Sequence, residues 1–391
     1  LEELGFFFKG KGVPKTSIET EGKYKCLTYG DLYTKYDYVI KNVKSFINDA
    51  SDSQEINFGD ICIAGSGETI EDIGKCAVFI DDKTGYAGGD IIIFRSDENP
   101  LTLSYILNSD LCKRQKYRLG QGHSVVHIYS SQLQNLKIPL PPLPEQKKIA
   151  DCLSTWDCAI EKQSQLINAL TQRKKALMQQ LLTGKKRLPG FEGEWKEVKL
   201  GDLFEKINRK NEEGNTNVVT ISAQRGFVKQ TDFFNKSVAS ETLDNYSLIY
   251  HGEFCYNKSY SNGYPLGATK RLIAFEKAVV TTLYICFKIK DQKKSNGSFF
   301  EQFFEANSLD RSLIKIAQEG GRAHGLLNVS LSDFFNIKIK LPPIEEQTAI
   351  AEILTIADRE LQLQKEKLAQ LQTQKKGLMQ VLLTGKKRLI N

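Results

Sequence analysis

The chain lacks the sequence signatures of most enzymes. Its 391 residues include only four histidines and two methionines, and they contain neither a Ser/His/Asp constellation nor a His-Glu-x-x-His pattern. Residues 5–11 approach a phosphate-binding loop, but Gly12 stands where a Ser or Thr should hold magnesium, and no apolar strand precedes it. The Pro-Pro pairs lack the polar and aromatic neighbours with which amino-methyltransferases hold a target amine. The sequence therefore predicts a non-catalytic protein with no cofactor or metal of its own.

Membrane and disulfide signatures are also missing. No apolar run is long enough to cross a bilayer and no signal peptide is present. The eight cysteines are scattered without a Cys-x-x-Cys pair, which favours free buried thiols in a reducing compartment over a zinc site or a disulfide framework. We therefore expect a cytoplasmic protein with no membrane partner.

Positive charge is in excess, but it is not spread along the chain. The net charge is +7, yet residues 1–139 carry 16 Lys and Arg against 19 Asp and Glu. A general affinity for polyanions therefore does not follow from charge. Any contact with nucleic acid would need local basic surfaces.

What the chain does have is a long internal repeat. Residues 140–188 and 341–389 match without a gap at an offset of 201 residues. Both copies open with Leu-Pro-Pro and Glu-Gln (the opening motif), and both end with Leu-Leu-Thr-Gly-Lys-Lys-Arg-Leu (the closing motif). The repeat predicts a molecule with approximate two-fold symmetry.

Each copy predicts a long helix that begins after an extended proline segment. Apolar residues alternate at spacings of four and three over several heptads, and Gly184 and Gly385 stand where helix C-caps are expected. A helix of roughly 38 residues spans roughly 55 Å. Taken alone, the heptads favour a structural spacer or an oligomerisation coil. The 150-residue block between the copies favours antiparallel pairing of the two helices with each other. Four matched polar residues interrupt the two seams and should fix the register of the pair: Gln163, Lys174, Gln364 and Lys375.

The blocks before the two copies also correspond. Residues 59–62 match residues 252–255, and Gly120, His123 and Ile138 match Gly321, His324 and Ile339. Both blocks contain short β-type runs divided by Gly, Asn and Ser clusters. The sequence predicts an α+β protein with two pseudo-symmetric α/β domains separated by an antiparallel coiled coil. The expected boundaries are 1–139 for the first domain, 140–190 for the central helix region, 191–340 for the second domain and 341–391 for the distal helix region.

These motifs resemble one known family. The doubled opening motif, long helix and closing motif are similar to the conserved regions of the specificity subunit of Type I restriction-modification systems, and residues 188–195 and 257–264 also resemble that family. The resemblance implies that two target-recognition domains each read half of a split site in double-stranded DNA. It also implies docking of two modification subunits, which use S-adenosylmethionine to methylate adenine N6. Restriction subunits would use ATP and Mg²⁺ to translocate and cleave DNA.

Two other readings remain open. The chain could be the specificity module of a methylation-only system without restriction subunits. It could also be a coiled-coil adaptor whose two domains bind proteins.

Candidate DNA-binding residues follow from side-chain chemistry, because Lys and Arg contact phosphates while Arg, Lys, Asn and Gln also read base edges. In each domain a basic stretch runs into a Gly-rich turn, and the second domain has two further polar loops. A solvated helix face, tight turns and structural histidines are the alternative interpretation. The candidates in the first domain are Lys113, Arg114, Lys116, Arg118, Gln121 and His123, and those in the second are Gln224, Arg225, Asn257, Lys258, Tyr260, Asn262, Arg322 and His324.

Overall fold

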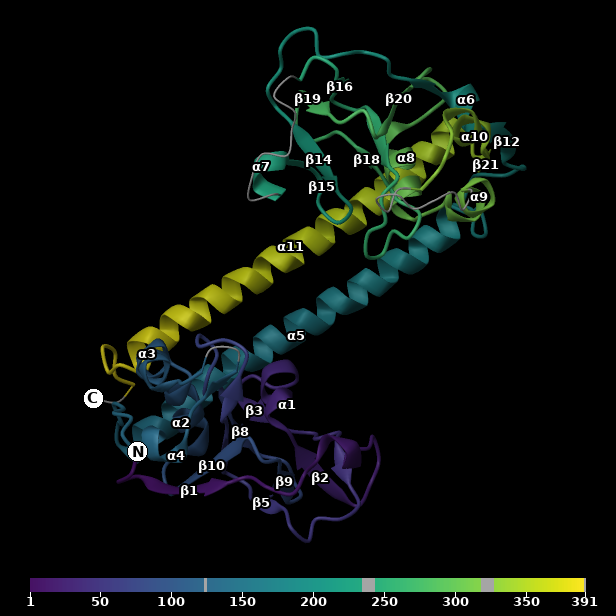
Figure 1. Cartoon of the computed structure of the whole chain (residues 1–391). Helices are drawn as coiled ribbons and strands as arrows, with labels where there is room; N and C mark the ends of the chain where they lie inside the picture. Colours follow the sequence, from purple (N-terminus) through teal and green to yellow (C-terminus); the bar gives the residue numbers. More distant parts are fainter. Residues whose placement is uncertain (123–124, 234–242, 318–326, 390–391) are drawn as a thin grey trace. The chain divides into compact units, whose positions relative to one another are not determined.

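The chain folds into two compact units that both long helices join. A computed structural model describes residues 1–122, 125–233, 243–317 and 327–389. The first unit comprises Leu1–Ser164 and Glu366–Asn391, and the second comprises Gln165–Lys365. Helices α5 (Leu143–Leu181) and α11 (Ile344–Leu382) each give one half to each unit (Figure 1). Every unit therefore contains helix segments from both copies of the repeat.

The first unit is built on a five-stranded sheet in the order β1-β10-β6-β8-β3. A four-stranded sheet, β4-β2-β9-β5, and a small pair, β11-β7, accompany it. The strands are β1 (Gly5–Lys9), β2 (Tyr24–Leu27), β3 (Val39–Ile40), β4 (Phe46–Ile47), β5 (Gln54–Ile56), β6 (Ile61–Ala64), β7 (Ser66–Gly67), β8 (Cys76–Phe79), β9 (Gly85–Ala87), β10 (Ile91–Ser96) and β11 (Val126–His127). The shorter helices are α1 (Tyr29–Thr34), α2 (Pro100–Leu107), α3 (Asp110–Leu119) and α4 (Ser130–Leu133), with a 3₁₀ turn at Lys15–Ser17.

The main sheet of this unit is covered on both faces. Side chains alternate along a strand, so Ile92 and Phe94 of β10 join one apolar cluster while Ile91 and Ile93 join another. The first cluster includes residues of α2 and α4, and the second includes residues of α1 and of the β4-β2-β9-β5 sheet. One of the short β-type runs of this block, residues 91–94, thus forms most of β10.

The second unit repeats the central part of this plan. Its main sheet has the order β13-β20-β17-β18, joined by the pairs β14-β15, β16-β19 and β12-β21. The strands are β12 (Lys196–Lys199), β13 (Phe204–Lys206), β14 (Val219–Ser222), β15 (Gly226–Lys229), β16 (Ser247–Tyr250), β17 (Phe254–Asn257), β18 (Ala268–Arg271), β19 (Lys277–Val280), β20 (Ile285–Ile289) and β21 (Lys338–Leu341). The shorter helices are α6 (Leu200–Leu203), α7 (Gln230–Phe233), α8 (Gly297–Glu305), α9 (Asp310–Ile316) and α10 (Leu331–Asn336).

Four strands of the first main sheet, β1-β10-β6-β8, correspond in order to β13-β20-β17-β18 of the second. Cys62 of β6 lies opposite Ile93 of β10, and Cys255 of β17 lies opposite Cys286 of β20. In the second unit Phe254 and Phe287 face α8 and α10 in one cluster, while Cys255 faces the β14-β15 hairpin in another. The faint correspondence between residues 59–62 and 252–255 therefore reflects a shared sheet.

Both long helices have the ends that the sequence predicts, with one difference. Gly184 and Gly385 follow the helices with φ values of +68° and +70°, the left-handed region in which glycine has no steric cost. Pro144, the last proline of the segment that was expected to precede the helix, lies in the first turn of α5. A proline is tolerated there because the first amide groups of a helix have no acceptor within it.

In the first unit the two helix segments run antiparallel and are joined by two ion pairs. Near the start of α5, Glu145 accepts from Arg388 Nε at 2.7 and 2.8 Å. Further along α5, Asp157 pairs with Lys375, which comes earlier in the chain than Arg388. Lys375 is only 5% exposed, and its burial lowers its pKa although Asp157 opposes the shift. Asp157 also accepts from the Tyr105 hydroxyl at 2.5 Å.

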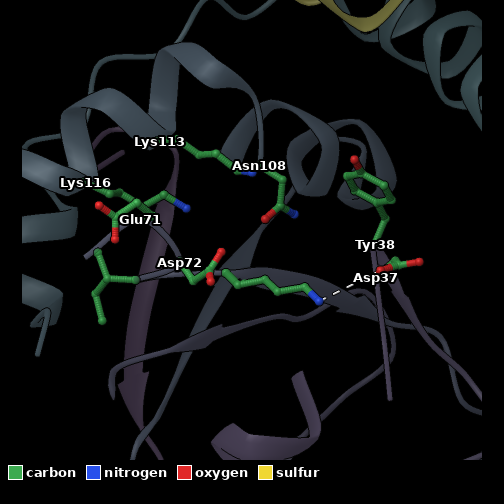
Figure 2. Close-up of a pocket in the computed structure, with 9 residues that line it drawn as sticks. Asp37, Tyr38, Glu71, Asp72, Asn108, Lys113 and Lys116 are labelled. Carbon is green, nitrogen blue, oxygen red and sulfur yellow. Dashed lines mark ion pairs between the residues drawn. The ribbon is translucent and has the colours of Figure 1, made fainter. Parts of the chain in front are cut away.

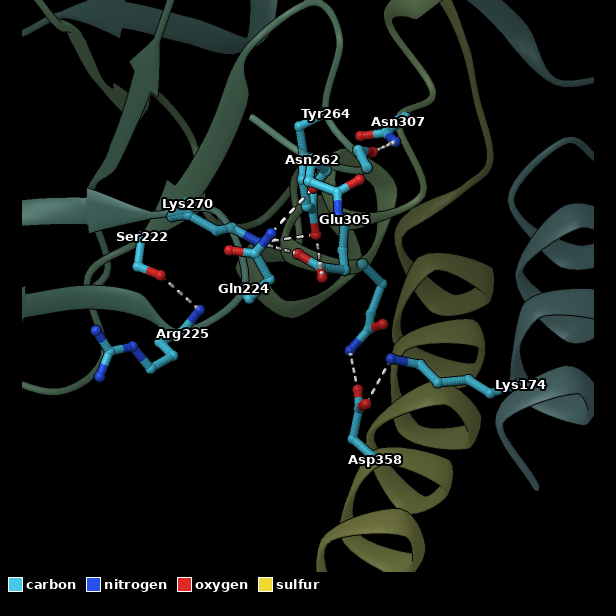
Figure 3. A network of polar contacts seen from close by, with 12 residues as sticks. Lys174, Ser222, Gln224, Arg225, Asn262, Tyr264, Lys270, Glu305, Asn307 and Asp358 are labelled. Atoms are coloured by element: carbon cyan, nitrogen blue, oxygen red, sulfur yellow. Dashed lines mark hydrogen bonds and ion pairs between the residues drawn. The ribbon is translucent and has the colours of Figure 1, made fainter. Parts of the chain in front are cut away.

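The second unit has the same two pairs with the roles of the helices exchanged. Arg187 donates to Glu346 at 2.6 and 2.7 Å, and the Trp195 indole donates to the same carboxylate at 3.0 Å. Lys174 pairs with Asp358, which also accepts from Gln302 at 2.7 Å (Figure 3). The lysines that the sequence marks as register residues thus each bind an aspartate of the other helix.

A glutamine in each opening motif ties the long helix to its domain. Gln146 Oε1 accepts from the Asn99 amide, and Gln347 Oε1 accepts from the Asn296 amide, both at 2.9 Å. Asn99 and Asn296 are themselves the N-caps of α2 and α8. The same hydrogen bonds therefore fix helix and domain in both units.

Two sequence predictions stay open at this level. Gln163 lies in the first unit and Gln364 in the second, and their role in fixing the register of the two helices remains a prediction. The domain boundaries at residues 139, 190 and 340 also remain predictions, because the compact units combine segments from both copies of the repeat.

We predict that Asp157→Ala destabilises the protein by about 1–3 kcal/mol, since it leaves the buried Lys375 ammonium without its carboxylate. Chemical denaturation monitored by circular dichroism measures this change. Asp151→Ala, an exposed change on the same helix, should stay within about 0.5 kcal/mol of wild type.

The same variant has a pH signature. Loss of Asp157 lowers the pKa of Lys375 further, so the unfolded chain binds more protons than the folded chain over a wider range below pH ~10. Stability of the variant should therefore rise with pH in that range more than wild type does. Equal slopes would contradict the assignment of Asp157 as the partner of Lys375.

Candidate nucleic-acid interface

Helix α3 presents only part of its predicted basic cluster to solvent. Ser109 caps the helix through a bond from the Cys112 amide, and Gly120 follows its last turn. Arg114 and Arg118 are exposed and, four residues apart, lie on one face of the helix. Within the cluster, these two arginines are therefore the best placed to contact a phosphate.

Lys116 requires a correction. It is 2% exposed, and its ammonium donates to the Gly74 carbonyl at 2.5 Å. Burial lowers its pKa. Because Cys112 and Lys116 are one helical turn apart, both side chains point into the domain, and Lys116 fills a core position there. We therefore leave it out of the proposed DNA interface.

Lys113 faces a pocket of mixed charge. The pocket has a volume of about 270 Å³ and is lined by Lys113, Lys116, Glu71 and Asp72 among others (Figure 2). At its edge Lys75 pairs with Asp37 at 3.8 Å. The carboxylates offset the lysines, so this pocket does not offer the uniformly basic surface that the sequence suggested.

The Gly-rich turn of the first unit lies beside the loop that follows β6. Gln121 and His127 exchange backbone hydrogen bonds of 2.9 and 2.7 Å, and β11 pairs with β7. The His127 ring contacts the Ser66 hydroxyl at 2.9 Å. Gln121 is exposed at this turn, whereas His123 lies outside the described residues. His127, which the sequence reasoning did not single out, joins the two loops.

In the second unit the structure brings two predicted loops together. The turn between β14 and β15 carries Gln224 and Arg225, and the loop after β17 carries Lys258, Tyr260 and Asn262. Gln224 Nε2 donates to the Asn262 carbonyl at 2.9 Å (Figure 3). These loops, which we proposed as separate candidates, form one polar surface.

A charged network that includes residues of α8 and β18 anchors the loop after β17. Glu305 of α8 accepts from the Tyr264 hydroxyl at 2.6 Å and pairs with Lys270. Burial and Glu305 together raise the pKa of Tyr264, and Asn307 Nδ2 donates to the Gly263 carbonyl at 3.0 Å. The network positions the loop while it leaves Tyr260 70% exposed.

The remaining candidates form hydrogen bonds within their own domain or lie outside the described residues. Asn257 Oδ1 accepts from the Ser259 amide at 3.0 Å, so its side chain shapes the loop. Lys258 is half-buried, and its carbonyl accepts from the Leu327 amide at 3.1 Å. Arg322 and His324 lie outside the described residues.

The backbone hydrogen bond of Leu327 has a counterpart in the first unit. In the first unit the Ile128 amide donates to the Gly65 carbonyl at 2.9 Å, as the Leu327 amide does to Lys258. Gly65 and Lys258 directly follow the matched strands β6 and β17. The chain therefore returns to the end of the same strand in both units.

Other kinds of site find little support in the described part of the chain. No group of three or more His, Cys, Asp or Glu residues there could hold a metal ion. Among the same residues, no helix is long and apolar enough to cross a membrane.

Comparisons with known proteins agree with the motifs. The family model for the Type I restriction modification DNA specificity domain matches residues 1–172 and 192–373. The chain is 30% identical over 406 residues to the putative type I restriction enzyme MjaX specificity subunit of Methanocaldococcus jannaschii, covering 97% of this chain and 88% of that protein. It is 28% identical over 308 residues to the MjaVIII specificity subunit of the same organism, covering 69% and 67%.

Solved structures share the fold. The S subunit of a Type I restriction-modification system from M. genitalium has a TM-score of 0.57 at 18% identity, covering 98% of this chain and 94% of that one. A chain from a structure of a type I R-M system assembly has a TM-score of 0.58 at 17% identity, covering 98% and 96%. The mixed α/β fold with long helices is thereby confirmed. The chain belongs to the family of type I restriction-modification DNA specificity subunits, as its motifs predicted.

We predict opposite phenotypes for Lys116 and Arg118. Lys116→Ala should lower the free energy of unfolding by about 2 kcal/mol or more, because it empties a core position. Arg118→Ala should change stability by less than about 0.5 kcal/mol, yet weaken binding of duplex DNA by the chain assembled with its partner subunits.

Lys116→Met is the matched control, because it keeps an apolar side chain in the core and removes the buried charge with its hydrogen bond to the Gly74 carbonyl. Its stability should lie closer to wild type than that of Lys116→Ala. Fluorescence anisotropy with labelled duplex DNA and thermal melting distinguish the two effects. Weakened DNA binding by a stable Lys116→Met protein would restore Lys116 to the interface.

Proposed function

We propose that this chain is a non-catalytic DNA-reading subunit that recognises a split DNA site, one half through each unit. One observation carries the proposal. The main sheets of the two units have corresponding strand orders and their helix contacts are equivalent, while their exposed loops differ. A shared framework with different reading loops suits a site whose two halves have different sequences.

The loops after the matched strands illustrate the difference. After β6 the exposed residues include Glu68, Thr69 and Ile70, whereas those in the loop after β17 include Tyr260 and Asn262. Carboxylates can accept from cytosine N4, and amides can bind adenine. Different loop chemistry therefore supports a non-palindromic target.

The repeated contacts of the long helices support the proposal that partner subunits dock on them. Their lysine–aspartate and arginine–glutamate pairs recur in both units, so two copies of one partner could bind equivalent surfaces. We propose modification subunits that methylate adenine N6 with S-adenosylmethionine as these partners. Restriction subunits using ATP and Mg²⁺ would complete the assembly. Methylation requires the adenine to leave the base stack, which DNA held on both sides would favour.

Methylome sequencing tests this function directly. A host that expresses the chain with its partner methyltransferase should gain one split, adenine-methylated motif, and a host with the methyltransferase alone should not. Absence of any motif would contradict the proposal and favour a protein-binding adaptor. A motif without DNA cleavage would indicate a methylation-only system.

We also predict that the helices set the gap between the half-sites. Inserting one heptad into both helices at the boundary between the units, after Ser164 and after Lys365, adds about 10 Å. That length corresponds to about three base pairs. The methylated motif should keep both half-sequences and gain a longer gap.

The matched control inserts the same heptad into α5 alone. The helices then differ in length, so we expect methylation to fall strongly. A change in either half-sequence after the paired insertion would contradict the role of the helices as a spacer.

A further inference from the structure

The β14-β15 hairpin carries Arg225 on its turn, and among the described residues no carboxylate pairs with this guanidinium. Ser222 pairs with Gly226 across the hairpin, so Ala223, Gln224 and Arg225 form a three-residue turn. Gly226 has a φ of +72°, a conformation that costs glycine little. The turn is therefore well defined by its backbone.

Two hydrogen bonds hold this turn in place. The Arg225 amide donates to Ser222 Oγ at 3.2 Å, and Gln224 Nε2 donates to the Asn262 carbonyl at 2.9 Å. Ala223 is buried in the cluster beneath the hairpin. Gln224 thus acts as a positioning residue, because its amide joins the turn to the loop after β17.

The Arg225 side chain is left free by these contacts. Its guanidinium points away from Ser222 and from the Gln224–Asn262 contact (Figure 3), and its Cζ lies 5.8 Å from the centroid of the Phe233 ring. Within the described parts of the chain it forms no ion pair. Glu305, the carboxylate that supports the loop after β17, is already paired with Lys270.

Charge and shape suit the major groove of duplex DNA. A two-stranded antiparallel ribbon fits that groove, and the fork of an arginine matches the O6 and N7 acceptors of guanine. Lys229, on the same hairpin, is exposed and lies where it could meet a phosphate. A turn held by its own hydrogen bonds loses little conformational freedom when it binds.

We propose that Arg225 reads a guanine in the half-site bound by the second unit. This inference rests on the proposed function and names one base and one residue for it. Lysine is a poorer substitute, because its ammonium is a point charge without the planar fork of two parallel N–H donors.

Methylome sequencing of Arg225→Gln and Arg225→Lys, each expressed with the partner methyltransferase, tests this inference. In both variants the guanine requirement should relax at one position of one half-site. Relative methylation of sites with another base there should rise by roughly 10- to 100-fold, and the other half-site should not change. Lys229→Gln is the matched control and should lower methylation evenly without changing the motif.

The outcomes separate the two proposals. A wild-type split motif that both Arg225 variants leave unchanged, or that they weaken evenly at all sequences, would overturn the guanine contact alone. No methylated motif with the wild-type chain would overturn the proposed function and the inference together. Thermal melting of the purified chain checks that the variants are folded, and Arg225→Lys keeps the charge if Arg225→Gln proves unstable.

Discussion

The structure depends on a reciprocal pair of buried carboxylates. Glu145 and Glu346 come from the two opening motifs, and each binds the arginine of the other copy's closing motif, Arg388 and Arg187. Both carboxylates are almost fully buried, where an unpaired charge would be costly. Each unit is therefore completed by a segment from the opposite end of the repeat. That exchange explains why both motifs occur twice with the same key residues.

The helices were predictable because their signal is local and periodic. Heptad spacing, prolines before the first turn and glycine after the last one all act within a few residues. The aspartates that bind Lys174 and Lys375 were harder to find, since Asp358 and Asp157 look like ordinary exposed helix residues. Their matched positions in the repeat were the only available signal. Tyr105 and Gln302, which share these aspartates, differ in chemistry, so residue type alone does not reveal that they correspond.

The candidate site was predictable in its residue types but not in its assembly. Lys116 was placed in a basic cluster, although its spacing from Cys112 already put both on one face of α3. Charge density along the chain does not report which lysine points inward; helical period does. The meeting of Gln224 with Asn262 could not be predicted, because it depends on two hairpins separated by 38 residues in sequence.

Framework and loops differ in how much change they tolerate. Replacing one member of a buried ion pair leaves its partner unsatisfied, so the helix contacts can change only in pairs. Arg225 and Tyr260, by contrast, extend from turns whose backbone is fixed by Ser222, Gln224 and Glu305. A substitution of either side chain removes no buried contact and should cost little stability. DNA preference can therefore change at the loop ends while the helices, and any partner that binds them, keep the same geometry.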